Sequence, residues 1–210
     1  MRPERPQFEP LSKPPLPQDG QRVARRRFVP TRTRNEFDIH EGRDTARVGG
    51  FRVIGTDTQM EQLRAALDFL RSFPDRRISE LVERLERSGN TVIELNSNMI
   101  VRYHPMHRTV SWDPKAAGWF GGRVQRPVCA LLHELAHADG DEHTPQLRLA
   151  RKKTPHERFE NAEEAHSIEL ESIVASYFGD ATRHDLAGKQ HPAQKVRVNG
   201  AFSTTRSGAS

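Results

Sequence analysis

Apolar residues recur at helical spacing in two neighbouring stretches near the start of the hydrophobic part of the chain. The first stretch predicts a helix over 60–72, which Pro74 terminates, and the second predicts a helix over 78–88, which Gly89 ends. The apolar positions that form the two stripes are Met60, Leu63, Leu67, Leu70, Ile78, Leu81, Val82 and Leu85. We expect both stripes to pack against a core rather than to form a binding site.

Shorter runs of β-branched and apolar residues, each bounded by turn residues, predict strands before and after these helices. The predicted strands cover 49–57, 91–95, 99–104 and 108–113. Pro114 closes the group, and the stretch after it, which contains Gly118, Gly121 and Gly122, is expected to be a loop. The chain up to this point therefore predicts two helices and three or four strands.

Two further helices are predicted in the second half of the chain. One begins at Pro127, which suits a first helical turn, and ends at Gly140 as a C-terminal cap, with a polar loop over 141–153 after it. The other begins at TPHE (154–157), which has the form of a capping box, and ends at Gly179. Four helices and a small sheet indicate an α+β fold.

The ends of the chain differ in composition from its middle. Seven of the 14 prolines lie in the first 30 residues, together with many arginines and few apolar side chains. Such a segment cannot bury enough apolar surface to offset its ordering entropy. We therefore expect 1–48 to be a disordered segment, 49–187 to be the folded domain and 188–210 to be a loose tail.

The charge and composition exclude several classes of partner. Residues 1–49 hold 11 Lys and Arg against 7 Asp and Glu, whereas the remaining 161 hold 22 against 21. The folded domain is thus nearly neutral, which disfavours nucleic acid as its partner. The sequence has neither the ~18-residue apolar run of a membrane helix nor the apolar core of a cleavable signal peptide. Cys129 is the only cysteine, so no internal disulfide can form.

The sequence HELAH (133–137) carries the main candidate chemistry. His133 and His137 are four residues apart and share a helix face, so both imidazoles can bind one zinc ion. Glu134 is turned about 100° away and lies beside the ion, where it can accept a proton from a zinc-bound water that attacks a peptide bond. Apolar residues flank the motif, which opposes a purely solvated face. Cys129 is too far along the helix to join both histidines and is read as a small buried residue.

The third zinc ligand has more than one candidate. HELAHADGDEH also matches the metzincin pattern, in which Gly140 turns the chain and His143 binds the metal. That class needs a methionine turn downstream, and all four methionines lie upstream. The segment AEEAHS (162–167) resembles the ligand segment of gluzincins, in which a hydroxyl residue follows the glutamate by three positions. Glu164 fits this pattern, with Ser167 in place, better than Glu163, and the choice among the three stays open.

The chain from about 50 to 187 resembles the NleD-like family of type III secreted effector zinc metallopeptidases. The segments that carry the resemblance are LVERLERSG, RTVSWDP, PVCALLHELAHA, ENAEEAHSIELES and FGDATRH. The resemblance implies a zincin-like domain, with a small mixed sheet, a helix for HExxH and a second ligand-bearing helix. It also implies cleavage of host proteins, mitogen-activated kinases in the known case, after secretion into the host cytosol through a type III system that reads 1–48.

We therefore expect a zinc-dependent endopeptidase with His133, His137 and Glu164 as ligands and Glu134 as general base. The resemblance places an arginine after the second helix, so Arg183 is the first candidate to stabilise the oxyanion. Tyr177 and His184 are further candidates by position. The strand RTVSWD (108–113) is expected to pair with extended substrate, and its Trp112 to face either the core or the substrate.

Two rival hypotheses belong to other classes. A catalytically dead module could use zinc only to fold, although a purely structural site has no need of Glu134. A nucleic-acid binder could act through the arginines of 22–27 and 31–34.

Overall fold

The two leading helices form as the apolar stripes predict. In the computed structural model, which describes residues 44–183 and 194–206, they are α1 (Asp57–Arg71) and α2 (Arg76–Ser88). Thr56 and Gln59 form a capping box at the start of α1. Gly89 ends α2 in the left-handed conformation, at φ 64°, which glycine adopts without strain. The stripe residues of both helices are buried, so the expectation of core packing is confirmed.

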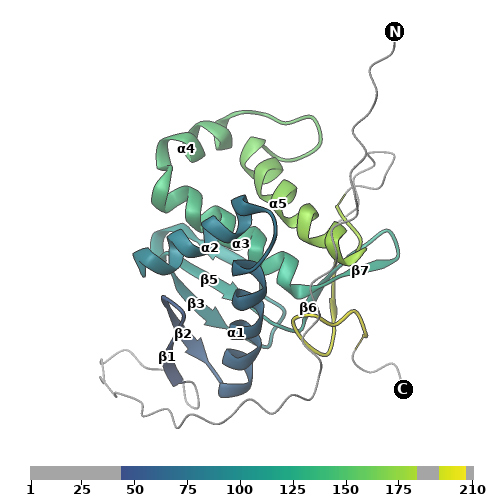
Figure 1. The fold of residues 1–210 in the computed structure, drawn as a ribbon. Helices are drawn as coiled ribbons and strands as arrows, with labels where there is room; N and C mark the ends of the chain where they lie inside the picture. Colours follow the sequence, from purple (N-terminus) through teal and green to yellow (C-terminus); the bar gives the residue numbers. More distant parts are fainter. Residues whose placement is uncertain (1–43, 184–193, 207–210) are drawn as a thin grey trace. The chain divides into compact units, whose positions relative to one another are not determined.

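A five-stranded mixed sheet lies against these helices (Figure 1). Its strands are β1 (Asp44–Val48), β2 (Phe51–Gly55), β3 (Val92–Leu95), β4 (Arg102–His104) and β5 (Thr109–Trp112). The strand order is β1-β2-β3-β5-β4, in which β2, β3 and β5 run parallel and the two outer strands run antiparallel to their neighbours. Consequently β4 is an edge strand and β5 is internal, paired on both sides.

Four of the predicted strands are confirmed, and the boundary at residue 48 is wrong. Asp44–Val48, which the sequence placed in a disordered segment, is strand β1 and pairs with β2. This strand was missed because DTARV has only one fully buried side chain, Val48. The rest of the expected disordered segment, residues 1–43, lies outside the described residues. The strand expected over 99–104 begins only at Arg102, because Met99 has a positive φ of 63°.

A second, three-stranded sheet contradicts the prediction of a loop and of a loose tail. It consists of β6 (Ala116–Phe120), β7 (Arg123–Gln125) and β8 (Gln194–Arg197), in the antiparallel order β7-β6-β8. Gly121 and Gly122 both have positive φ and form the two-residue turn of the β6–β7 hairpin. The glycines that suggested a loop are therefore hairpin residues. Of the expected tail, 194–197 pairs with β6 and 198–206 is also described, and the remainder lies outside the described part.

The helix that contains HELAH is longer than predicted. It is α3 (Pro127–His143), and Gly140 lies inside it as an ordinary helical residue. A Cβ at position 140 would lie 2.9 Å from Cδ of Arg148 and 3.3 Å from a carboxylate oxygen of Glu163. Gly140 is therefore present because other side chains cross the helix there, and not because the chain turns.

The last two helices also depart from the sequence prediction. The expected polar loop contains α4 (Pro145–Lys153), and α5 (Ala162–Phe178) begins seven residues later than the capping box suggested. Its actual cap is Asn161, whose side chain accepts hydrogen bonds from the amides of Glu163 and Glu164. Gly179 ends α5 at φ 69°, as predicted.

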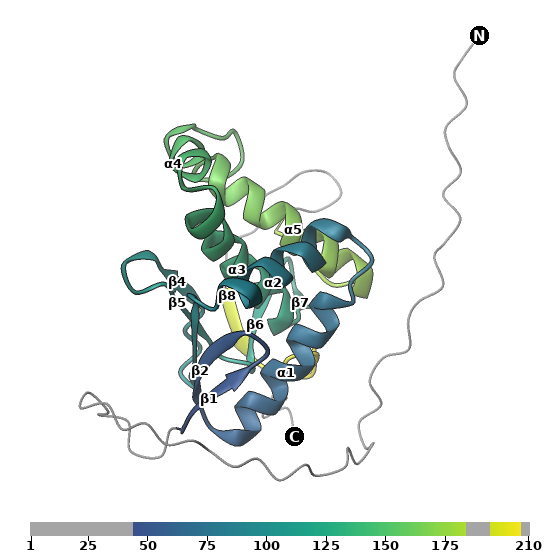
Figure 2. The same ribbon diagram turned by 60° about the vertical axis from the view of Figure 1, so that its left-hand side comes forward.

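The described residues thus form an α+β fold with a mixed sheet, as expected. Figures 1 and 2 show α3 and α5 side by side, with α2 close to α3. Helix α4 lies near the C-terminal end of α3 and the N-terminal end of α5. The core joins the sheet to α1, α2, α3 and α5, and Trp112, Leu132 and Leu135 are among its largest fully buried side chains. No helix in the described part of the chain is long and apolar enough to cross a membrane.

Candidate metal centre

The packing of α3 against α5 brings three predicted ligand residues together. Nε2 of His133 lies 3.2 Å from Nε2 of His137, and Glu164 places one carboxylate oxygen 3.4 Å from the first and the other 3.2 Å from the second. Both histidines are buried, whereas the Glu164 side chain is 29% exposed. The three donor groups therefore converge at a position that solvent can reach from the Glu164 side.

The distance between the two imidazole nitrogens is short enough for one metal ion to contact both. With Zn–N bonds of about 2.0–2.1 Å, the ligand atoms of a tetrahedral site lie about 3.3–3.4 Å apart. The 3.2 Å between the two imidazole nitrogens is close to this value, whereas the 3.4 and 3.2 Å contacts of Glu164 involve two different oxygens. Two imidazoles and one carboxylate also form a donor set that zinc accepts and that magnesium and calcium, which prefer oxygen ligands, do not favour.

The other nitrogen of each imidazole faces a buried carboxylate. Nδ1 of His133 lies 2.8 Å from a carboxylate oxygen of Glu171, and Nδ1 of His137 lies 3.2 Å from Glu163. Both glutamates are only 1% exposed. A carboxylate at Nδ1 holds the ring proton there and leaves a lone pair at Nε2. Both lone pairs then point at the position that Glu164 also faces, an arrangement that needs a cation or added protons.

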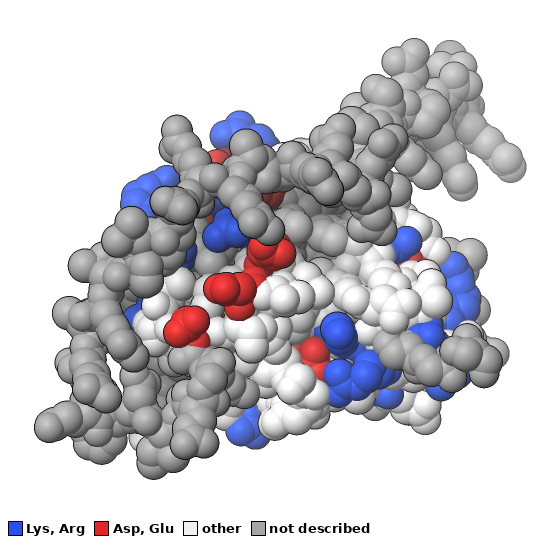
Figure 3. All heavy atoms as spheres, turned by 90° about the horizontal axis from the view of Figure 1, so that it is seen from below, with Lys and Arg blue, Asp and Glu red and all other residues white. Residues whose placement is uncertain are grey.

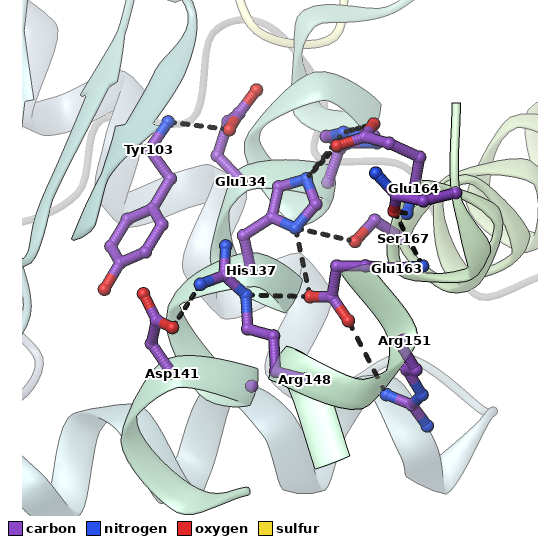
Figure 4. Close-up of polar contacts among 12 residues, drawn as sticks. Tyr103, Glu134, His137, Asp141, Arg148, Arg151, Glu163, Glu164 and Ser167 are labelled. Carbon is purple, nitrogen blue, oxygen red and sulfur yellow. Dashed lines mark hydrogen bonds and ion pairs between the residues drawn. The ribbon is translucent and has the colours of Figure 1, made fainter. Parts of the chain in front are cut away.

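Each of these two carboxylates is in turn paired with an arginine. Nε of Arg148, on α4, donates to Glu163 at 2.9 Å, and Nε of Arg183 lies 3.3 Å from Glu171. Figure 4 shows His137 between Glu164 on one edge of its ring and Glu163 with Arg148 on the other. The arginines neutralise carboxylates that could otherwise not stay charged at this depth.

In the metal-free protein, these contacts shift the pKa values of the histidines upward. Burial alone would lower the pKa of His133, but the carboxylates of Glu164 and Glu171 outweigh it and raise the pKa to about 9. Burial also opposes protonation of His137, yet Glu163 and Glu164 raise its pKa above the ordinary value. Protons therefore stabilise the cluster when no metal is bound, and a metal ion must displace them.

The glutamates show the complementary shifts. Contacts with His133 and then His137 lower the pKa of Glu164 strongly, against a smaller effect of burial. Burial raises the pKa of Glu163 and of Glu171, but the neighbouring histidine and arginine cations outweigh it, so both values are lowered. All three carboxylates are accordingly ionised at neutral pH.

Glu134 lies beside the cluster and contacts the free edge of the sheet. Its carboxylate accepts a hydrogen bond of 2.7 Å from the backbone amide of Tyr103 in β4, as Figure 4 shows. It is half-buried and is not part of the group that could hold a metal ion. The structure therefore keeps Glu134 next to the ligands, as its position in the motif predicts, and it adds an unpredicted tie to the edge strand.

The structure separates His143 from the other histidines. Because α3 continues through Gly140, His143 is about 9 Å further along the helix than His137 and on a different face. Its Nδ1 lies 3.0 Å from Asp139, which is also held by Arg84 at 2.7 Å. The arrangement of a metzincin site is therefore absent from the described residues, and of the three candidates it is Glu164 that meets the histidines.

The sequence reading of Glu163 was incomplete. It preferred Glu164 over Glu163 by the position of Ser167 and gave Glu163 no other role at the site. The structure instead directs both neighbouring glutamates at His137, Glu164 toward Nε2 and Glu163 toward Nδ1. Adjacent helical residues can do this because they approach the two opposite edges of one imidazole ring.

The two candidates for oxyanion stabilisation occupy different surroundings. Arg183 lies near the centre, against Glu171 and at 5.9 Å from the ring of Phe120. Tyr177 is about 20 Å along α5 from Glu164, and its ring packs on Phe69. Tyr177 is therefore a core residue and not a group of this site, while His184 lies outside the described residues.

Three further sequence expectations can be compared with the structure. Trp112 is fully buried, and its indole nitrogen donates to the carbonyl of Pro127, so it faces the core. The strand that contains it, β5, is paired on both sides and cannot add a substrate strand, which makes the expected role of 108–113 wrong. Cys129 is fully buried, as expected, and burial raises the pKa of its thiol.

Several residues around the centre were not identified from the sequence. Glu171 could have been, since it lies seven residues after Glu164 on the same helix face. Arg148 was missed because its helix was read as a loop, and Lys195 because its strand was read as a tail. The Lys195 ammonium donates to the carbonyl of Met99 at 3.1 Å. Its pKa is lowered by burial, and the charges of Glu134 and Arg183 also act on it.

Comparisons of the chain with protein-family models, with curated proteins and with solved structures found no match.

Proposed function

We propose that this protein is a zinc-dependent endopeptidase. The observation that supports the proposal is the convergence of His133, His137 and Glu164 within 4.8 Å of one another, with Glu134 beside them on α3 and hydrogen-bonded to the edge strand β4. A zinc ion held by these residues would supply a Lewis acid and a water of lowered pKa. The partial exposure of Glu164 is consistent with an open position for substrate.

Glu134 is the residue proposed to move the proton. As general base it takes a proton from the attacking water, and as the acid form it returns that proton to the leaving amine. Its hydrogen bond to the amide of Tyr103 fixes the carboxylate at the edge of the sheet. A residue that only stabilised the fold would not need this place beside the ligands, which favours an enzyme over an inactive module stabilised by zinc.

The edge strand β4 is the proposed docking place for the substrate backbone, in place of β5. It is paired on one side only, so an extended peptide can add to the part of its edge that Glu134 does not already bind. Two exposed apolar side chains flank it, Ile100 at 43% and Met106 at 93% exposure, and they offer contacts for substrate side chains. Protein is the proposed substrate class for this reason.

Arg183 and Lys195 are the proposed cations of the transition state. The charges of Glu134 and Arg183 both act on Lys195, but Arg183 already neutralises Glu171. Lys195 binds a backbone carbonyl, a partner that it can exchange at little cost. We therefore propose Lys195 beside Arg183 as a stabiliser of the oxyanion.

The finer biological assignment rests on the sequence resemblance alone. We propose on that basis a zincin-like domain of the NleD-like effector type, delivered by a type III system and acting on host proteins such as signalling kinases. Nucleic acid is a weaker proposal. On the face shown in Figure 3, acidic and basic side chains both occur among uncharged ones, and neither sign covers the described surface continuously.

The decisive experiment combines metal analysis with cleavage mapping. Purified protein is loaded with zinc, its metal content is measured, and it is incubated with host-cell lysate with and without a chelator while new protein termini are mapped. The proposal expects about one zinc per chain and new termini that disappear with the chelator. Zinc binding without any new terminus would instead favour the inactive zinc-stabilised module, and absence of zinc would refute both.

A further inference from the structure

The helix α4 contributes one buried side chain to the surroundings of the metal centre. Arg148 is only 5% exposed although the residues on either side of it, Leu147 and Leu149, are about half exposed. Its Nε donates to Oε1 of Glu163, the same oxygen that faces Nδ1 of His137. The guanidinium of α4 is therefore one carboxylate away from a proposed metal ligand.

The same guanidinium contacts two other parts of the fold. One terminal nitrogen makes an ion pair with Asp141 on α3, and the group lies 5.6 Å from the ring of Tyr103 in β4. Figure 4 shows Arg148 between Asp141 and Glu163. The backbone amide of Tyr103 holds the proposed base Glu134, so Arg148 touches supports of both a ligand and the base.

Helix α3 leaves room at Gly140 for the side chain of Arg148. Gly140 leaves space where any other residue would place a Cβ 2.9 Å from Cδ of Arg148 and 3.3 Å from Glu163. A glycine inside a helix costs about 1 kcal/mol relative to alanine, so its presence here has a local reason. The reason is the passage of the Arg148 side chain across the helix to Glu163.

We propose that Arg148 is a positioning residue of the metal centre and that α4 acts as a clamp on it. By fixing Oε1 of Glu163, Arg148 fixes the orientation of the His137 ring, so metal affinity depends on the docking of α4. The guanidinium is suited to this because it is planar and can bind two carboxylates at once, which the single ammonium of lysine cannot do in the same geometry. The inference rests on the proposed metal centre but does not require peptidase activity.

The test measures metal binding by the full-length chain. Zinc affinity is determined by competition with a chromophoric chelator, and ligand geometry by the visible spectrum of the Co²⁺-substituted protein. We expect Arg148→Met to weaken zinc binding by about 10-fold and to alter the Co²⁺ spectrum, the scale found when an outer support of a ligand is lost. Arg148→Lys should recover only part of the affinity.

Arg151→Met is the matched control. Arg151 belongs to the same helix and faces the same glutamate, but at 3.9 Å and with a side chain that is 27% exposed. Its loss removes the same charge without removing the buried contact, and exposed ion pairs contribute little. We expect its zinc affinity to stay within about 2-fold of wild type. An equal effect of the two substitutions would mean that net charge, and not position, is what matters.

A double-mutant cycle tests whether Arg148 acts through Glu163. If it does, the variant with both Arg148→Met and Glu163→Gln should bind zinc about as weakly as the Glu163→Gln variant alone, because the path is already broken. Additive losses would contradict a path through this glutamate.

Thermal unfolding in the presence of a chelator separates positioning from general stability. A lower Tm of Arg148→Met with unchanged zinc affinity and an unchanged Co²⁺ spectrum would overturn the proposal. If that variant does not fold, Arg148→Lys and Asp141→Asn decide, since each keeps a buried cation and disturbs only its placement. Wild-type protein that binds zinc without cleaving protein would refute the proposed function and leave this inference standing.

Discussion

The two histidines of the candidate centre share one metal position but have unlike supports. Nδ1 of His133 has a single carboxylate within reach, that of Glu171 at 2.8 Å. Nδ1 of His137 has two oxygens at 3.2 Å, from Glu163 and from the hydroxyl of Ser167. The His137 side therefore retains a partner when one is removed, and the His133 side relies on one glutamate among the described residues.

The parts of the fold behind the two sides differ as well. Glu171 is backed by Arg183, which belongs to the stretch after α5. Glu163 is backed by Arg148 and, more loosely, by Arg151, both on α4. The stretch after α5 thus supports one ligand and a single short helix supports the other. This teaches that two equivalent ligands of one motif can depend on unrelated segments of the chain.

The largest effect on zinc binding is expected from Glu164, which contacts both histidines. Glu164 contacts Nε2 of both His133 and His137, so Glu164→Ala removes charge and geometry from both at once. We expect the bound zinc to fall below about 0.1 equivalent and cleavage to disappear, because a catalytic site has only three protein ligands. Elemental analysis after dialysis measures this. Retention of a full equivalent would remove Glu164 from the ligand set.

Glu134→Gln should leave both histidine ligands and their supporting carboxylates intact while it stops the reaction. Glutamine keeps the size of the side chain and can still accept from the Tyr103 amide, but it cannot take a proton. We expect unchanged zinc content and a fall in cleavage rate of at least ~10²-fold. Zinc lost from this variant would mean instead that Glu134 supports the site structurally.

Glu171→Gln and Glu163→Gln compare the two sides directly. We expect zinc affinity to fall by about 100-fold in the first variant and by about 10-fold in the second, within the usual range for such supports. The reason is that Ser167 can still hold Nδ1 of His137. Chelator competition measures both losses of zinc affinity. Combining Ser167→Ala with Glu163→Gln should give a loss as large as that of Glu171→Gln. Equal losses of zinc affinity in the two single variants would contradict the view that only His137 has a second partner at Nδ1.

Zinc binding should become tighter as the pH rises. The pKa of His133 in the metal-free protein, about 9, is above its ordinary value near 6.5, and that of His137 is also raised. Protonation of His133 thus stabilises the metal-free fold fully below about pH 6.5, and this contribution is lost as the pH rises through about 9. Zinc competes with the same protons, so the gap in Tm between zinc-loaded and chelator-treated protein should widen over that window. Calorimetry in buffers of different ionisation enthalpy should show proton release near pH 7, and a pH-independent gap would contradict the shifts.

The sequence was informative where spacing within one helix decides the geometry. The separation of His133 and His137 places both on one face in any helix, and Glu164 and Glu171 share a face for the same reason. The stripes of α1 and α2 and the strands β2 to β5 were equally readable from period alone. These features need no knowledge of how the elements pack.

The sequence was misleading where a residue serves a neighbour in space. Gly140 was read as a helix end, but it makes room for Arg148, which comes from another helix. Strands β6 and β7 are five and three residues long and β8 is mostly polar, so none has the alternation that predicts a strand. Arg148 comes from α4 in the expected loop and Lys195 from β8 in the expected tail, so the sequence pattern did not indicate either residue.

The smallest effect is expected from His143→Ala, and it tests the remaining rival for the third ligand. His143 pairs with Asp139 at the end of α3, and Asp139 keeps Arg84 as a partner when the histidine is removed. We therefore expect zinc content to be unchanged and cleavage to fall by less than ~10-fold, because the substitution touches neither side of the centre. Zinc lost from this variant but kept in Glu164→Ala would mean that α3 breaks at Gly140 in solution and that His143 completes the site. The comparison between the two supports would then no longer describe the functional centre, although His133, Glu134 and His137 would keep their assignments.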